Sequence, residues 1–356
     1  MIGTPLSAVL AEPNAMADLS GRDWERLFEQ ARTTNLLARI ALVAFDHGHA
    51  AKLPPRPRNH LEAARRQAAW QHRTVRWEVD CIRRALAPLA TPVILLKGAA
   101  YLLADLPAAK GRLFSDVDIM VPRDRLGQVE RALFAHGWHI QSIDAYDQRY
   151  YREWMHELPP MIHARRQTAL DVHHTIAPLT ARYPVDAAKL LAARTPIGIA
   201  DFFVLAPADM VLHSIIHLFQ EGQFEHGLRD LLDVDDLLRH FGRDPSFWHG
   251  LTDRAAEHGL GRPLYYAAQQ LRYFLATPMP ADFLASLERF RPGGATRSAM
   301  DAILRAGIAG HQSQGGHAFA DVSRWFLYIR GHYMRMPLRL LIPHLIRKGW
   351  HQQEEE

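Results

Sequence analysis

The sequence predicts an α+β fold in which a small mixed β-sheet core lies between two helical regions. Helical periodicity dominates residues 1–90, and short β-branched or alternating segments separated by helices follow over residues 91–205. From residue 206 to residue 356 the helical pattern returns. We therefore expect an N-terminal helical region, an α/β core and a C-terminal helical region with these boundaries.

Bulk properties indicate a globular protein. The chain has 356 residues, of which 48% are hydrophobic and 22% charged, close to the average for soluble domains. Its start carries no cationic segment typical of a secretory signal, and the lone Cys81 cannot form an internal disulfide, so we expect a cytoplasmic protein. The net charge of +4 suits an anionic substrate such as a nucleotide, but it is too small and too dispersed to predict nucleic-acid binding.

The helical regions are predicted from the spacing of apolar residues. Trp24, Leu27 and Phe28 recur at helical intervals, and a second helix is expected from about residue 61 to residue 89. We expect the proline-rich stretch 53–59 to be a loop. Two further helical patterns, at 208–222 and 226–242, each end at a glycine.

The α/β core is predicted from a change in the pattern of apolar residues at residue 91. Short apolar or alternating runs predict strands, and a polar turn divides the last of them into two. A glycine, Gly137, is a plausible C-terminal cap for the amphipathic helix before it. The expected strands are 92–96, 115–121, 138–143 and a pair within 160–176, and the expected helices are 97–106 and 123–137.

Two carboxylates occupy one face of the strand expected at 115–121. Asp116 and Asp118 are two residues apart, so their side chains project from the same face about 6 to 7 Å apart along the backbone. Val117 and Ile119 point the other way, into a core. A buried strand gains nothing from two unpaired carboxylates, whereas hard divalent cations would offset their repulsion and desolvation. The pattern therefore predicts a site for a pair of Mg²⁺ or Mn²⁺ ions.

A phosphate site is predicted where the first strand gives way to a helix. Lys97 and Gly98 stand at this junction, where backbone N–H groups are free and glycine allows close approach of a triphosphate. Arg112, shortly before the acidic pair, offers another cation. Two metal ions bridging phosphate oxygens would support in-line displacement.

The segments LLKGAAY, RLFSDVDIMV and ALDVHHT together resemble the signature of the polymerase-β nucleotidyltransferase superfamily. The Lys-Gly pair, the Arg-x-x-Ser-Asp-x-Asp arrangement and a later Asp-x-His are similar to the bacterial uncharacterised nucleotidyltransferases. The helical stretch LHSIIHLFQEGQFEHGLRDLLDVDDLL also resembles that group, so the resemblance covers roughly residues 90–240.

The resemblance implies roles for individual residues. Asp116 and Asp118 would coordinate both metal ions, and Asp171 would complete the metal site and help to activate the acceptor. Gly98 would lie against the phosphates. The nucleotide-binding set would be Lys97, Gly98, Ala99, Arg112 and Ser115. Ala99 departs from the serine or glycine that is common at this position, which removes a hydroxyl from the phosphate site.

The implied activity is Mg²⁺- or Mn²⁺-dependent transfer of a nucleoside monophosphate from an NTP, such as ATP, to a hydroxyl or similar acceptor, with release of pyrophosphate. The acceptor, a small molecule or a protein, is not identified by the sequence. Because Ala99 replaces the usual residue, a catalytically inactive nucleotide- or partner-binding module on the same fold stays open as the alternative.

Histidines leave several interpretations open. His173 lies on the same side of its expected strand as Asp171, where it could contact a metal ion, a phosphate, a base or an acid. His213 and His217 are four residues apart on one expected helix, a spacing that permits zinc binding, although no HExxH pattern accompanies them. Hydrogen-bonding core histidines are the favoured interpretation, and a metal-dependent phosphohydrolase using them is a third possibility.

Two more features concern charged residues of the C-terminal region. Arg229 and Asp233 have the spacing of a helical ion pair, but the resemblance also allows them to line a substrate cleft. The segment 328–350 is both basic and apolar, as in helices that lie on anionic membranes. Its prolines, Pro337 and Pro343, argue against one long helix, so membrane contact is the less favoured interpretation.

Overall fold

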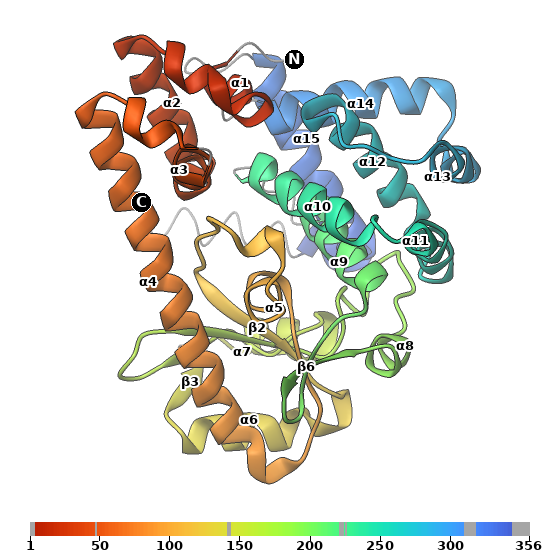
Figure 1. The fold of residues 1–356 in the computed structure, drawn as a ribbon. Helices are drawn as coiled ribbons and strands as arrows, with labels where there is room; N and C mark the ends of the chain where they lie inside the picture. Colours follow the sequence, from red (N-terminus) through yellow and green to blue (C-terminus); the bar gives the residue numbers. More distant parts are fainter. Residues whose placement is uncertain are drawn as a thin grey trace.

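The computed structural model describes residues 4–46, 48–140, 144–220, 224, 226–309 and 318–343. A β-sheet with its covering helices occupies the lower half of the molecule in Figure 1, and a larger assembly of helices lies above it. The long helix α4 (Pro55–Leu86) runs down one flank from the upper helices to the far end of the sheet. This arrangement confirms the predicted α+β fold with a mixed sheet and flanking helices.

The sheet has seven strands in the described part of the chain, in the order β3-β4-β5-β2-β1-β7-β6. It is mixed, because β1 pairs in parallel with β7 and β2 with β5, whereas the other four pairings are antiparallel. The strands are β1 (Val93–Leu95), β2 (Asp116–Met120), β3 (Trp138–Ile140), β4 (Met161–His163), β5 (Ala169–His173), β6 (Thr195–Ile199) and β7 (Phe202–Val204).

The strand with the acidic pair lies in the middle of the sheet. β2 has β1 on one side and β5 on the other, and Val117 and Ile119 are buried. Burial of these apolar side chains on one face fixes the register, since a slip of one residue would turn them toward the carboxylate face. The expected strands at 92–96, 115–121 and 160–176 are thus confirmed; of the strand expected at 138–143, residues 141–143 lie outside the described residues.

Two strands were not predicted from the sequence. β6 contains Pro196 and Gly198, which weaken the pattern of a strand, and it forms an edge of the sheet, where a proline is tolerated. Gly198 has a φ of +76° and lies in the irregular stretch of the pairing with β7. β7 is a short run whose parallel pairing with β1 is a long-range contact that local periodicity does not reveal.

The prediction of a loop over residues 53–59 is wrong from Pro55 onward. α4 begins at Pro55 and contains Pro57 in its first turn. The first four N–H groups of a helix have no partner within it, so prolines there remove no hydrogen bond. Before α4 come α1 (Pro5–Ala11), α2 (Gly21–Thr33) and α3 (Leu37–Asp46).

Four short helices accompany the sheet. The helix after β1 opens with Lys97, and the helix before β3 ends two residues before Gly137, whose φ of +95° suits a glycine. A π-helical turn follows the third of them at Tyr150–Trp154. The helices are α5 (Lys97–Leu103), α6 (Leu126–Ala135), α7 (Ala145–Arg149) and α8 (Ala187–Ala192).

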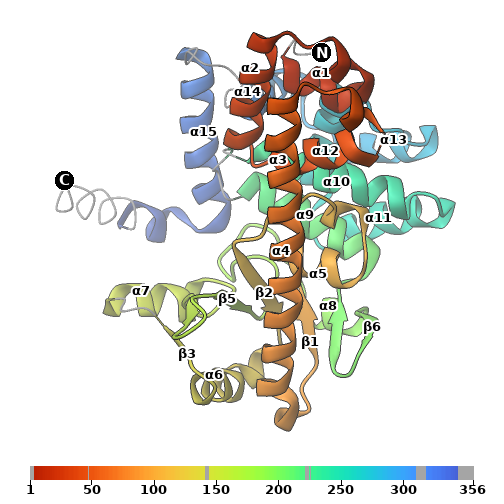
Figure 2. The same cartoon turned by 60° about the vertical axis from the view of Figure 1, so that its left-hand side comes forward.

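The helices of the C-terminal region pack against those of the N-terminal region. Figures 1 and 2 show both groups on the same side of the sheet, and α1 contacts α12. α9 is almost entirely buried because neighbouring helices pack on several of its sides. The helices are α9 (Pro207–Gln220), α10 (Gly227–Phe241), α11 (Pro245–Glu257), α12 (Gly261–Leu275), α13 (Ala281–Leu287), α14 (Gly294–Ala309) and α15 (Ala318–Arg335).

The basic and apolar segment at the C-terminal end is interrupted, as its prolines predict. α15 ends at Arg335, Pro337 follows, and a short helix resumes over 338–343; residues 344–350 of the segment lie outside the described residues. Within the described part of the chain, no helix has both the length and the apolar character needed to span a membrane.

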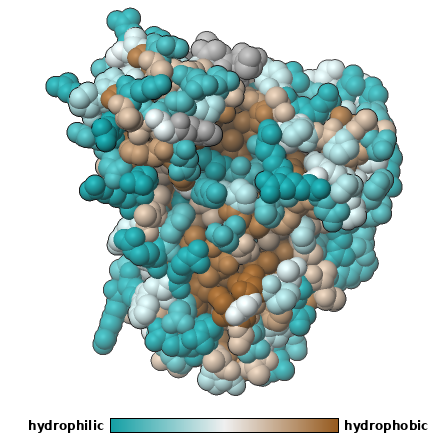
Figure 3. All heavy atoms as spheres, viewed as in Figure 1, coloured by the Kyte–Doolittle hydropathy of each residue, from teal (hydrophilic) through white to brown (hydrophobic). Residues whose placement is uncertain are grey.

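An apolar hollow opens on the face shown in Figure 3, over the region of α5, β6 and α9. It has a volume of about 360 Å³, and its lining includes Leu103, Ile197, Met210 and Phe241. The acidic pair of β2 does not line it, so this hollow is separate from the site described next.

Candidate active site

The structure brings three carboxylates together where β2 and β5 lie side by side. Asp118 and Asp171 are directly opposite each other in the parallel pairing, and Asp116 precedes Asp118 by two residues on the same face. One oxygen of each carboxylate lies within 4.8 Å of the others. The parallel pairing of β2 with β5 therefore places a third acid, Asp171, beside the two acids of β2.

These carboxylates open into a cavity of about 530 Å³ between the sheet and the helices. The sheet side contributes acidic residues and the loop before β2, and the helical side contributes cations and amides. The lining consists of Asn35, Gln71, Lys97, Gly98, Arg112, Leu113, Phe114, Ser115, Asp116, Asp118, Glu157, Asp171, His217, His226 and Arg229. The cavity thus joins the N-terminal helices, the sheet and the C-terminal helices in one site.

Asp118 is held by two cationic or polar neighbours through the same oxygen. Lys97 Nζ lies 3.1 Å and His173 Nε2 3.0 Å from Asp118 Oδ1. Burial raises the pKa of the Asp118 carboxyl, but the Lys97 ammonium and the hydrogen bond from His173 outweigh it and hold this pKa below its usual range. Both partners contact Oδ1, and Asp118 also lines the cavity.

Asp171 has the opposite electrostatic environment. Burial, the negative charge of Asp118 and that of Glu157 raise the pKa of Asp171 to about 7. Two neighbouring carboxylates whose pKa values are driven apart in this way are typical of sites that bind cations or exchange protons.

Glu157 is an acidic residue of the site that the sequence analysis missed. It forms an isolated antiparallel bridge with His173, and its Oε2 lies 3.3 Å from His173 Nδ1. Glu157 stands in an irregular segment before β4, where neither period-two nor helical spacing indicates which way a side chain points. The sequence marks this segment as extended only through Pro159 and Pro160, which follow Glu157 by two and three residues.

The space next to Gly98, at the junction of β1 and α5, is filled by side chains of the protein. A Cβ atom at Gly98 would lie 2.6 Å from the Phe114 ring and 3.1 Å from Arg112 Nε, so glycine is needed here for the loop before β2 to pack. Ala99 is buried and does not line the cavity. Ser115 does line it, and its hydroxyl donates a hydrogen bond to Asp116 Oδ1 at 2.9 Å.

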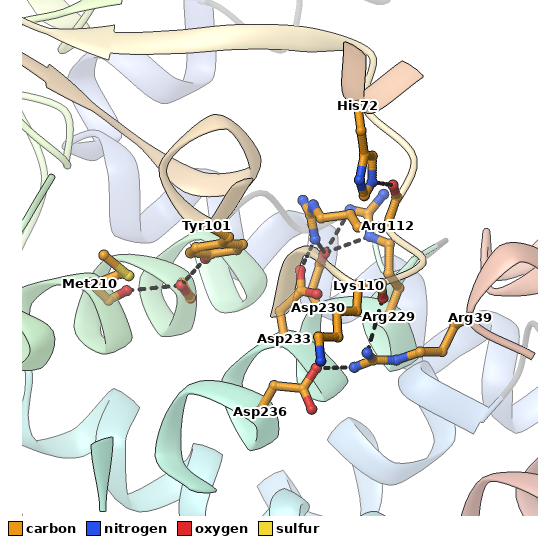
Figure 4. Close-up of polar contacts among 11 residues, drawn as sticks. Arg39, His72, Tyr101, Lys110, Arg112, Met210, Arg229, Asp230, Asp233 and Asp236 are labelled. Carbon is orange, nitrogen blue, oxygen red and sulfur yellow. Dashed lines mark hydrogen bonds and ion pairs between the residues drawn. The ribbon is translucent and has the colours of Figure 1, made fainter. Parts of the chain in front are cut away.

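Arg112 connects this loop to α10. Figure 4 shows its side chain between Asp230 and Asp233 of α10, and it forms an ion pair with Asp233 and lies 4.0 Å from Asp230. The guanidinium carbon lies 5.7 Å from the centre of the Tyr101 ring, and the backbone carbonyl of Arg112 contacts His72 Nε2 at 3.0 Å. This largely buried arginine therefore fixes the loop before β2 against three helices, α4, α5 and α10.

A family model described as uncharacterised nucleotidyltransferase matches residues 20–276. The chain belongs to this family. No curated protein and no solved structure gave a match. Membership supports nucleotidyl transfer as the general activity, and the match includes every element that lines the cavity, from the N-terminal helices to α10.

The remaining site residues predicted from the sequence belong to α9 and α10 of this nucleotidyltransferase. His217 and Arg229 line the cavity, whereas His213 is buried beneath it. Burial and then the Lys97 charge hold the pKa of His213 well below its usual range, so it is neutral. Arg229 pairs with its neighbour Asp230 at 2.6 Å, and not with Asp233.

The residues at the acidic cluster fit a pair of hard divalent cations. Asp116, Asp118 and Asp171 offer only oxygen ligands, which Mg²⁺ and Mn²⁺ prefer, and their mutual repulsion would be relieved by bound cations. The helical side also contributes His226 and Asn35, which the sequence analysis did not name as site residues: His226 lies in the stretch that resembles the family but outside its His-containing helix and its Leu-Arg-x-x-x-Asp, and Asn35 stands in a turn between two helices.

Proposed function

We propose that the protein is a Mg²⁺-dependent (or Mn²⁺-dependent) nucleotidyltransferase that moves a nucleoside monophosphate from an NTP, such as ATP, to an acceptor hydroxyl and releases pyrophosphate. Asp116, Asp118 and Asp171 are the proposed metal ligands and catalytic residues. The observation that carries the proposal is the meeting of these three carboxylates within 4.8 Å at the wall of a cavity of about 530 Å³.

The cavity has the charge pattern that this substrate needs. Four carboxylates crowd the sheet side, and Lys97 is the ammonium group beside them. Arg229 and His217 stand on the helical side of the same cavity. We propose that the divalent cations bind on the sheet side and that Lys97 and Arg229 contact the phosphates of the donor.

In the proposed reaction an acceptor oxygen attacks the α-phosphorus, the bond between that phosphorus and the bridging oxygen to the β-phosphate breaks, and pyrophosphate leaves. Bound divalent cations would neutralise phosphate charge and favour the deprotonated acceptor. In this proposal Asp171, the third carboxylate of the cluster, accepts the acceptor proton. Asp118, fixed by Lys97 and His173, keeps its charge throughout.

The remaining predicted nucleotide-binding residues take positioning roles in this proposal. Ser115 orients Asp116 through its hydroxyl, and Gly98 admits Phe114 so that the loop before β2 can pack. Arg112 holds the same loop to α10. We place the acceptor on the side of the cavity formed by Asn35 and Gln71, because these uncharged amides, from the turn between α2 and α3 and from α4, lie outside the sheet.

Pyrophosphate release tests the proposal. The full chain is incubated with each of the four NTPs, Mg²⁺ or Mn²⁺, and panels of hydroxyl-bearing small molecules and of proteins. We expect pyrophosphate release that requires the metal ion and is abolished in the double variant Asp116→Asn/Asp118→Asn, with unchanged circular dichroism. Metal-dependent NTP binding without turnover against any acceptor would instead support the inactive binding module.

A further inference from the structure

A second group of metal-ligand side chains lies beside the three aspartates. His156, Glu157 and His173 each place one ligand atom within 4.8 Å of the others. The rings of the two histidines are 5.1 Å apart between centroids. This group differs in chemistry from the acidic cluster, because two of its three ligands are imidazole nitrogens.

The backbone fixes the positions of these three residues. The segment that precedes β4 runs antiparallel to β5, with Glu157 opposite His173. Hydrogen bonds on both sides hold the pairing: Leu158 N–H donates to Val172 at 2.8 Å, and His174 N–H donates to the carbonyl of His156 at 2.8 Å. The side chains are therefore brought together by the pairing of two segments, and not by a flexible loop.

His173 has a ring nitrogen whose natural partner is a cation. Its Nε2 lies 3.0 Å from Asp118 Oδ1, and a carboxylate accepts, so Nε2 carries the hydrogen. The other ring nitrogen, Nδ1, lies 3.3 Å from the carboxylate oxygen of Glu157, so a positive charge belongs between them, either a proton on Nδ1 or a metal ion. Burial lowers the pKa of His173, but the hydrogen bond to Asp118 and the charge of Glu157 raise it above its usual value, so a proton can take this place when no metal ion is bound. His173 is only 1% exposed, and its Nδ1 makes no hydrogen bond within the described part of the chain. A lone pair facing a carboxylate repels unless a positive charge lies between them.

His156 presents the same chemistry from the other side. Its Nδ1 is buried and has no hydrogen-bond partner among the described residues. Burial, together with the charges of His173 and Lys97, holds the pKa of His156 well below its usual range, so its ring is neutral and can act as a ligand. Two buried ring nitrogens without hydrogen bonds thus meet one carboxylate.

We propose that His156, Glu157 and His173 bind a divalent transition-metal ion of the zinc class, through Nδ1 of each histidine and the carboxylate of Glu157. Zinc favours imidazole and carboxylate ligands, and sites with two histidines and one glutamate leave a fourth position for water or substrate. The hydrogen bond from His173 Nε2 to Asp118 matches the carboxylate–histidine–metal arrangement that orients metal-bound histidines in proteins.

The local charge balance accommodates this ion in addition to the proposed Mg²⁺ ions. Asp116, Asp118, Asp171 and Glu157 line one cavity, and Lys97 is the ammonium that pairs with this group. The four carboxylates outnumber the cationic side chains that pair with them, so a further cation lowers the energy of the group. A bound ion would tie the segment before β4 to β5 and, through His173, orient Asp118. This inference goes beyond the proposed reaction and does not depend on its donor or acceptor.

Cobalt binding tests the site without any assay of activity. The full chain is first treated with a chelator and then titrated with Co²⁺ in the presence of excess Mg²⁺, which keeps the oxygen-ligand site filled. We expect a single equivalent of Co²⁺ to bind with a visible absorption band typical of nitrogen ligands. His156→Ala should weaken binding by more than about 100-fold, beyond the loss usual for second-shell changes, and the isosteric Glu157→Gln should weaken it by at least about 10-fold.

Two controls separate this site from the acidic cluster. His139→Ala, which removes an exposed histidine of β3, should leave cobalt binding unchanged. Asp116→Asn should weaken Mn²⁺ binding, followed by electron paramagnetic resonance, and leave the cobalt band intact, whereas His156→Ala should do the reverse. Thermal unfolding checks that each variant folds, and Glu157→Gln replaces His156→Ala if the latter does not.

Three results would overturn the proposal: no cobalt band in the wild-type chain, a band that survives both His156→Ala and Glu157→Gln, or a band that disappears in Asp116→Asn. Either of the first two results would show that the positive charge between His173 and Glu157 is a proton on His173, whose ring then pairs with both Asp118 and Glu157. None of these results depends on nucleotidyl transfer, so a failure here is distinct from a failure of the proposed function.

Discussion

Charged residues are arranged in opposite ways on the sheet side of the cavity, called here the sheet wall, and on its helical side, called the helical wall. On the sheet wall, Asp116, Asp118, Asp171 and Glu157 are crowded together with the ammonium of Lys97. On the helical side, the acids of α10 are matched by arginines: Asp236 pairs with Arg39, Asp233 with Arg112 and Asp230 with Arg229. Of these residues, Arg112 and Arg229 line the cavity itself. Figure 4 shows this matched set along α10, facing the loop that leads to β2.

This difference indicates that the charges of the helical wall stabilise the structure, whereas those of the sheet wall serve function. A matched ion pair lowers its own energy without any ligand, and breaking it leaves a buried charge without compensation. Crowded carboxylates raise the energy of the ligand-free fold and are relieved only by protons or cations. We infer that the helical wall holds the molecule together and that the sheet wall is built for cations, and the following predictions test that contrast.

The largest effect is expected from Asp118→Asn. The change removes a charge from the proposed metal site, so kcat for nucleotidyl transfer should fall by about 1,000-fold or more, as for loss of a strong electrostatic stabiliser of a transition state. The free energy of unfolding of the metal-free chain should fall as well, because Lys97 and His173 lose the carboxylate with which they pair and whose pKa they hold low. Steady-state kinetics and urea unfolding measure the two effects.

A second prediction concerns the helical wall. Asp233→Asn should lower the free energy of unfolding by about 3 kcal/mol, because Arg112 is left buried without its ion-pair partner. Urea denaturation of variant and wild type gives this difference. The sheet wall should be unaffected, so the affinity of the folded variant for Mn²⁺ should match that of the wild type.

A double variant provides the control for this ion pair. Arg112→Met/Asp233→Leu removes both charges at once, and we expect it to recover most of the lost stability, because an apolar pair of similar volume replaces a buried ion pair. If Asp233→Asn is as stable as the wild type, the matched charges of α10 do not hold the loop before β2, and the contrast between the walls fails.

A third prediction uses pH. The folded-state pKa of Asp171 is raised from its ordinary value to about 7, so the fold favours its protonated form. Its contribution to stability is therefore fully present below pH 4 and is lost as the pH rises through 7. We expect a loss of about 2 kcal/mol in the metal-free chain over this range, reduced from the full-burial value by partial exposure.

The control for the pH effect is Asp171→Asn, in which this fall in stability between pH 4 and pH 7 should be absent. Titrating groups distant from Asp171 contribute equally to both proteins, so the difference between the two stability curves reports on Asp171 and the charged groups that interact with it, Asp118, Glu157 and His173 among them. Saturating Mg²⁺ should also remove the fall in the wild type, since a cation replaces the proton. Parallel curves for wild type and variant without metal would show that Asp171 is not crowded by Asp118.

The sequence predicted the sheet wall better than the helical wall, for a physical reason. Asp116 and Asp118 share a face because strand geometry has a period of two, and the family resemblance supplied Asp171 on a separate strand. Arg112 was expected at the phosphates, but its side chain lies between Asp230 and Asp233, residues distant in sequence that only the packing of α10 brings close. Glu157 and its pairing with His173 likewise depend on an irregular segment that no periodicity marks.

The smallest effect we predict concerns the backbone of Lys97, where the two uses of charge meet. This residue has a φ of +44°, in the left-handed region that costs a non-glycine residue about 1 kcal/mol or more. Its ammonium pairs with Asp118, so the strain is retained at the residue that fixes a proposed metal ligand. Both Lys97→Ala and Lys97→Gly remove the ion pair, but only glycine also removes the strain.

We therefore expect Lys97→Gly to be more stable than Lys97→Ala by about 1 kcal/mol in urea unfolding, whereas both variants should lose the same fraction of NTP affinity. Equal stabilities would show that the backbone at Lys97 is unstrained. A smaller loss of NTP affinity in the glycine variant would show that backbone geometry, and not the ammonium, is what this position contributes to the donor site. Only the second result would remove the Lys97 ammonium from the proposed contacts with the donor.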